Sequence, residues 1–114
     1  MIGSLARFAS SFAALLSEPN ESEINGRTAD IREAMQEAMA PYIRHKTVLP
    51  LIWRSIAVAP DIDSLWYLRS NLLAMLSEHC GERGAQSTLA TITEMFRGAV
   101  PDTRMPKKNR FNER

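Results

Sequence analysis

Apolar residues recur at helical spacing along most of the chain, and this pattern predicts an all-α protein, a bundle of four or five helices. A first helix is expected at 2–16, where apolar side chains cover about half of the helical wheel. A polar connection follows at 18–27. Thr28 is then placed to cap a second helix that runs to about Ala40 and stops at Pro41. The apolar positions of this helix follow a regular series: Ile31, Ala34, Met35, Ala38 and Met39.

The segment 48–59 is almost entirely apolar, with Arg54 and Ser55 as its polar positions. Strict alternation is missing, so the pattern favours a helix over a half-buried strand. Thr47 is placed to cap this helix, with Pro50 in the first turn, where proline is tolerated. A surface that is apolar nearly all round predicts a central, mostly buried helix. The many β-branched residues leave a buried strand as the alternative.

Residues 62–97 are typical of an antiparallel helical hairpin. Asp61 is placed to cap its first helix, which runs to about residue 79 and closes at Gly81. The second helix, 83–97, carries a narrow apolar stripe and closes at Gly98. Because the connection is short, the two helices should pack as neighbours.

The length of 114 residues indicates one domain, to which we assign residues 1–100. The net charge of +1 is unevenly distributed. Residues 1–100 carry a net charge of −2, whereas 101–114 carry +3 and are rich in proline, lysine and arginine. We expect 101–114 to be a flexible basic tail.

Few residues in the chain could support catalysis. Cys80 is the only cysteine and lies beside His79, but helix neighbours one position apart point in different directions and do not form a nucleophile–base pair. The sequence has no paired-cysteine or His-x-x-x-His spacing and no glycine-rich phosphate loop. We therefore expect no enzymatic activity, no cofactor and no metal site.

The expected location is the cytoplasm, because a single cysteine permits no internal disulfide and no apolar run is long enough for a transmembrane segment. The first 17 residues contain no acidic side chain, which leaves two interpretations of the helix at 2–16. It packs in the core, or it serves targeting or binding to a membrane surface.

Arg69 stands out, because it falls in the middle of a wide apolar arc on the helical wheel. A guanidinium in such a position must either donate to an acceptor or reach water while its aliphatic stem lies along the apolar surface. In the first interpretation it lies in a groove between two packed helices. In the second, Trp66, Arg69 and Leu73 form a partner-binding face, since tryptophan and arginine are enriched at interface hot spots.

These patterns predict a small, non-enzymatic protein-interaction module, regulatory or scaffolding, that forms a homodimer or binds another protein. The reason is surplus apolar surface, which marks association sites. The alternative is a small regulatory nucleic-acid-binding protein whose basic side chains contact phosphates. The residues assigned to that alternative are Arg44, Lys46, Arg104, Lys107, Lys108 and Arg110.

Overall fold

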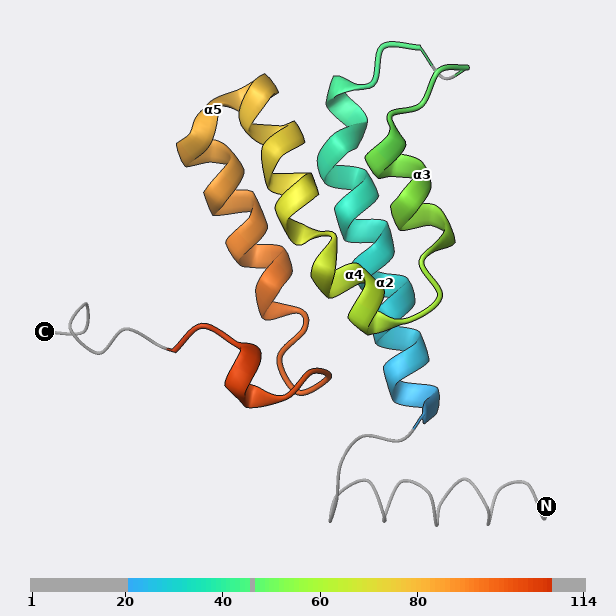
Figure 1. The fold of residues 1–114 in the computed structure, drawn as a ribbon, viewed down its shortest axis with the longest axis vertical. Helices are drawn as coiled ribbons and strands as arrows, with labels where there is room; N and C mark the ends of the chain where they lie inside the picture. Colours follow the sequence, from blue (N-terminus) through green and yellow to red (C-terminus); the bar gives the residue numbers. More distant parts are fainter. Residues whose placement is uncertain (1–20, 46, 108–114) are drawn as a thin grey trace, which may run out of the picture.

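The computed structural model describes residues 21–45 and 47–107 and confirms the all-α class (Figure 1). Its helices are α2 (Glu21–Met39), α3 (Leu51–Val58), α4 (Ile62–Tyr67) and α5 (Arg69–Glu94). Two 3₁₀ turns, η1 (Ala40–Tyr42) and η2 (Asp102–Arg104), complete the described structure. Within those two ranges, strand-like pairing is limited to one isolated bridge between Arg97 and Val100. The expected helix at 2–16 lies outside the described residues.

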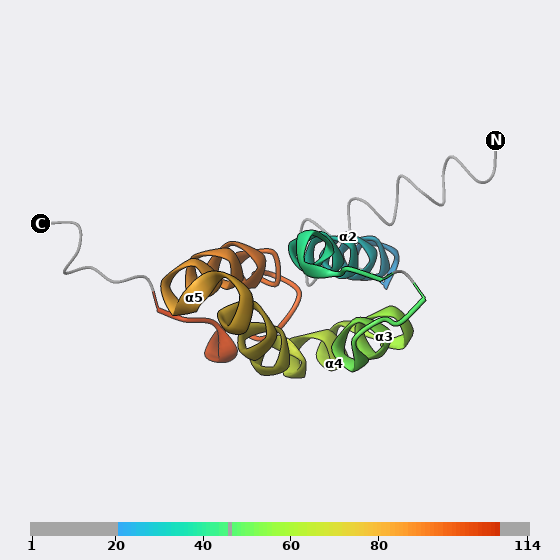
Figure 2. The ribbon, with the colours of Figure 1, turned by 90° about the horizontal axis from the view of Figure 1, so that it is seen from above.

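The helix α2 is central, because it contacts α3, α4 and α5. Seen from above, α2 and the second half of α5 form one layer, and α3, α4 and the first half of α5 form the other (Figure 2). Apolar side chains from both layers are fully buried in a single core. The largest are Ile31, Met35, Met39, Ile56, Leu65, Leu72, Leu76 and Phe96.

The predicted hairpin is present, and Gly81 makes its turn. Its φ of 83° and ψ of 161° interrupt α5 and divide it into a first limb (69–80) and a second limb (82–94). The limbs run antiparallel, since Arg69 Nη1 at the start of one donates to Thr93 Oγ1 at the end of the other, 3.1 Å away. Glycine is required at this turn because an L side chain is strained in that region of backbone space.

The ends of the hairpin differ in part from the prediction. Asp61 caps the first helix as expected, accepting a 2.9 Å hydrogen bond from the backbone N–H of Ser64. An interruption at Leu68, however, separates α4 from the first limb of α5. The second limb ends at Glu94 rather than at 97, and Gly98 lies in the following turn with a φ of 87°.

The start of α2 was predicted wrongly. The helix begins at Glu21, so most of the expected polar connection is helical. Thr28 is not a cap, because it is buried inside the helix and its hydroxyl donates to the carbonyl oxygen of Ile24, 2.7 Å away. Ile24 and Thr28 extend the buried stripe of Ile31 backwards at helical spacing. Glu21 and Glu23 favour a start here, because acidic side chains suit the positive end of the helix dipole.

The segment after α2 contains a helix rather than a strand, but the predicted environment is wrong. The helix α3 spans Leu51–Val58 with Pro50, not Thr47, at the N-cap position. It lies at the edge of the fold (Figure 1). Ile56 is its one fully buried side chain, so it is not the central helix that its composition suggested.

The start of the predicted tail, 101–107, is ordered and packs against the helices. Met105 is buried in the core, only 5% exposed. Arg104 Nη1 forms a 2.8 Å ion pair with Asp63 Oδ1 at the start of α4. The prediction of a flexible tail is therefore wrong for 101–107. Residues 108–114 lie outside the described residues.

Candidate functional site

Arg69 lies at the junction of α4 and α5 with its guanidinium stacked on Trp66. The guanidinium carbon is 3.5 Å from the centroid of the indole ring, a cation–π contact. Arg69 Nε donates to the carbonyl oxygen of Trp66 at 3.2 Å, and Nη1 donates to Thr93 Oγ1 at 3.1 Å. Burial lowers the pKa of the Arg69 guanidinium, which remains charged at neutral pH.

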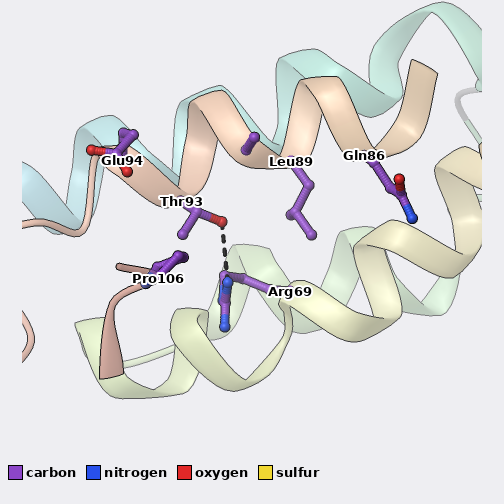
Figure 3. Close-up of a pocket in the computed structure, with 7 residues that line it drawn as sticks. Arg69, Gln86, Leu89, Thr93, Glu94 and Pro106 are labelled. Atoms are coloured by element: carbon purple, nitrogen blue, oxygen red, sulfur yellow. Dashed lines mark hydrogen bonds between the residues drawn. The ribbon is translucent and has the colours of Figure 1, made fainter. Parts of the chain in front are cut away.

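A pocket of about 300 Å³ opens beside this side chain (Figure 3). The second limb of α5 supplies most of its wall, and Pro106 closes one side. The lining residues are Arg69, Gln86, Leu89, Ala90, Thr93, Glu94 and Pro106. The walls are mainly apolar, with the polar groups of Arg69, Gln86, Thr93 and Glu94 among them.

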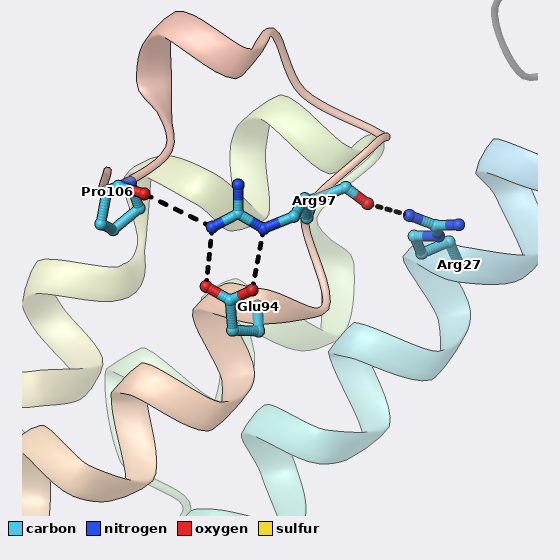
Figure 4. Close-up of polar contacts among 4 residues, drawn as sticks. All are labelled: Arg27, Glu94, Arg97 and Pro106. Carbon is cyan, nitrogen blue, oxygen red and sulfur yellow. Dashed lines mark hydrogen bonds and ion pairs between the residues drawn. The ribbon is translucent and has the colours of Figure 1, made fainter. Parts of the chain in front are cut away.

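The Pro106 wall is held in place by Arg97 (Figure 4). Its guanidinium forms a two-point ion pair with the carboxylate of Glu94, with distances of 2.8 and 2.9 Å, and Nη2 also donates to the carbonyl oxygen of Pro106 at 3.4 Å. The same Glu94 hydrogen bonds raise the pKa of Arg97. The backbone carbonyl of Arg97 in turn accepts a hydrogen bond from Arg27 on α2. The C-terminal segment is thus attached through Arg97 to the second limb of α5 and to α2, which form one layer.

The expected partner face is only partly at the surface. Trp66 is 8% exposed and makes an edge-to-face contact with Phe96, with ring centroids 5.1 Å apart. Leu73 is half-buried and packs against the core. Arg69 therefore lies between the buried Trp66 side chain and the pocket.

Three of the four large exposed apolar side chains of the described chain lie in α3 or just before it, and the fourth, Tyr67, ends α4. Val48, Leu51 and Val58 are 74%, 72% and 78% exposed. Leu51 and Val58 are seven positions apart and lie on one face of α3. Sequence reasoning missed this surface, because an all-round apolar segment was taken to be buried.

The residues assigned to nucleic acid do not form one surface in the described chain. The segment that follows η1 lies at the top of Figure 1, whereas η2, drawn in red, lies low in the same view. Arg44 is exposed in the first of these segments. Arg104 is engaged by Asp63, whose hydrogen bond raises the pKa of the arginine. Lys107 is exposed. The remaining assigned residues, Lys46, Lys108 and Arg110, lie outside the described residues.

Cys80 and His79 lie at the hairpin turn, beside the end of α2. The His79 ring stacks on Tyr42 with centroids 5.0 Å apart. The exposed Cys80 Sγ lies 3.2 Å from the carbonyl oxygen of Leu76, to which a thiol can donate. The pKa of the Tyr42 hydroxyl is raised, mainly because of its hydrogen bond with Cys80. In this arrangement the imidazole stacks on a ring, and the thiol is directed at a backbone carbonyl.

Residues 21–45 and 47–107 contain no group of three or more side chains that could hold a metal ion. None of the helices in those ranges combines the length and apolar character needed to span a bilayer.

Comparison with known proteins gave no match to a protein-family model, to a curated protein or to a solved structure.

Proposed function

We propose that the protein is a small, non-enzymatic helical interaction module that associates with a second copy of itself through α3. The observation that carries this proposal is the exposure of Val48, Leu51 and Val58. Apolar side chains that gather on one surface and remain in water favour association, because their burial is worth roughly 25 cal/mol per Å².

The position of α3 supports this use. The helix is at the edge of the fold, so a second copy could approach it without displacing α2 or α5 (Figures 1 and 2). Arg54 is exposed on the same side as Leu51 and Val58, and its aliphatic stem can widen the apolar strip. A twofold pairing of α3 with α3 would use the same residues from both copies.

Sedimentation velocity of the full chain at micromolar concentration tests the proposal, with a dimer as the expected species. Leu51→Glu and Val58→Lys should each shift the population to monomer by placing a charge in the interface. Both charges suit the ends of α3 at which they stand, so the fold is preserved. Ala74→Glu, at an exposed position on the first limb of α5, is the matched control and should remain dimeric.

A full chain that stays monomeric would overturn the proposal. Dimerisation that survives both α3 substitutions would also reject α3 as the interface. A chain lacking residues 1–17 supplies a second comparison: if only the shortened chain dimerises, the chain's own N-terminal segment covers α3, and self-association of the full chain is rejected.

Nucleic-acid binding remains the alternative prediction, and no observation in the described ranges favours it. It requires DNA or RNA affinity that falls steeply with salt and decreases when 108–114 are removed. This shorter truncation is the appropriate one, because removing Met105 as well would disturb the core. Affinity that is unchanged by the truncation would reject a role for Lys108 and Arg110.

A further inference from the structure

We infer that the pocket beside Arg69 binds the carboxylate of a small organic acid with an apolar body. This inference goes beyond self-association, because the pocket is built by α5 and the C-terminal segment, whereas the proposed dimer surface is on α3. If the protein proved to be a monomer, the inference about this pocket would still stand.

The first argument is charge. Arg69 is half-buried, yet no carboxylate within 21–45 and 47–107 forms an ion pair with it, since the ion pairs there are Arg97–Glu94 and Arg104–Asp63. Its acceptors are a hydroxyl and a backbone carbonyl, which are neutral. A partly desolvated charge without a counter-ion gains more from a bound anion than a fully hydrated one does.

The second argument is geometry. Trp66 covers one face of the guanidinium plane, and Nε and Nη1 each hold one intramolecular acceptor. Nη2 makes no hydrogen bond to a residue that the structure describes, and Nη1 keeps a second N–H. Both nitrogens therefore keep N–H groups that can donate to a bound carboxylate.

The third argument is the rest of the lining (Figure 3). Leu89, Ala90 and Pro106 supply apolar walls for a hydrocarbon body. Gln86 Nε2 donates to Glu82 Oε1 at 3.4 Å and keeps a second N–H that can donate to a ligand. A carboxylate with a short apolar chain therefore fits better than inorganic phosphate, which offers nothing to these walls. Glu94 on the same lining repels a dianion more strongly than a singly charged carboxylate.

Two sources share this chemistry, a free aliphatic acid and the C-terminal residue of a peptide. Isothermal titration or ¹H–¹⁵N spectra of the full chain with 4-methylpentanoate and with N-acetyl-Gly-Gly-Leu distinguish them. We expect at least one to bind with a Kd on the order of 1 mM or tighter. 4-Methylpentanamide, of the same shape but uncharged, and inorganic phosphate should each bind at least about tenfold more weakly.

Three variants locate the site. Arg69→Gln removes the charge and should lower affinity by about tenfold or more. Because Arg69 also holds the hairpin together, Ala90→Leu provides a test that leaves those hydrogen bonds intact: it fills the pocket from an exposed helical position. Gln86→Glu places a second negative charge on the lining. Both should lower affinity by a similar factor, whereas Ala74→Leu, away from the pocket, should leave it unchanged.

The site would be established if the protein binds a carboxylate more tightly than its amide and loses this preference in Arg69→Gln and Ala90→Leu. The carboxylate that binds more tightly, the free acid or the peptide, would identify the source of the ligand. Absence of binding by both carboxylates would overturn the inference. Equal affinity of acid and amide would do the same, as would binding that is insensitive to Ala90→Leu.

Discussion

Arg32 on α2 holds the C-terminal end of α3 through Ala59, whose carbonyl oxygen lies 2.6 Å from Arg32 Nη2. Arg32 Nε also donates to the carbonyl oxygen of Ile56 at 3.2 Å. Carbonyls at the end of a helix have no partner within the helix and carry the negative end of its dipole. One arginine therefore donates to two carbonyls at this helix end, of which that of Ile56 also accepts from the backbone N–H of Ala59, and attaches the edge helix to the central one.

Replacing Arg32 by Gln should lower the free energy of unfolding by about 1–2 kcal/mol, because a shorter, neutral side chain loses both charge-assisted hydrogen bonds. Urea denaturation followed by circular dichroism measures the change. Arg83→Gln, at an exposed position on the second limb of α5, is the control and should change stability by less than about 0.5 kcal/mol. Equal effects of the two substitutions would show that the carbonyl contacts contribute nothing.

Alanine substitution should have opposite effects at two glycines. Gly81 has a φ of 83° and a ψ of 161°, so Gly81→Ala should cost about 1–3 kcal/mol through backbone strain, even though the added Cβ would meet open space. Gly26 lies inside α2 with no atom within 4 Å of such a Cβ, so Gly26→Ala should stabilise by about 0.5–1 kcal/mol. Thermal unfolding of both variants compares the signs. A stabilising Gly81→Ala would contradict the turn described here.

Much of the fold was predictable because local signals agreed with the tertiary structure. Asp61 caps its helix, and Gly81 adopts a left-handed φ, as their positions in the pattern indicated. Of the apolar stripe expected over 83–97, Ala85, Ile92 and Phe96 are buried and Leu89 is half-buried. Each signal is a short-range one, in which the residue type and its immediate neighbours determine the backbone.

The errors arose where packing between distant segments decides the result. The apolar character of α3 gave no indication that Leu51 and Val58 would remain exposed, because burial depends on which elements are available to cover a helix. Met105 is held in the core by contacts with the helices, which the polar, proline-rich sequence around it does not reveal. The Arg69 pocket likewise requires Pro106, distant in sequence, to close one side.

Stability should depend on pH through Asp61. Hydrogen bonds from Ser64, first from its hydroxyl and then from its backbone N–H, lower the pKa of this carboxyl below its ordinary value of 3.8. The folded state therefore binds the proton more weakly than the unfolded state. The contribution is complete above the unfolded pKa and is lost as the pH falls through the folded one.

Asp61→Asn keeps a capping oxygen but cannot titrate, and it is the matched variant. The stability advantage of the wild type over Asp61→Asn should therefore be largest at neutral pH and shrink as the pH falls below about 4. Urea denaturation at several pH values between 6 and 3 measures this difference. An advantage that grows on acidification would contradict the depressed pKa.

Two truncations should separate the packed part of the C-terminal segment from the rest. Removing 108–114 leaves every contact of Met105 and Arg104 described here in place and should change the free energy of unfolding little. Removing 102–114 exposes the surface that Met105 covers and also breaks the ion pair with Asp63. Burial of a methionine side chain is worth about 1.5–3 kcal/mol, which sets the expected loss.

The point variant Met105→Ala should reproduce most of that loss, while Lys107→Ala, at an exposed neighbour, should have little effect. If both truncations were equally stable, 101–107 would be a tail in solution, as the sequence alone suggested.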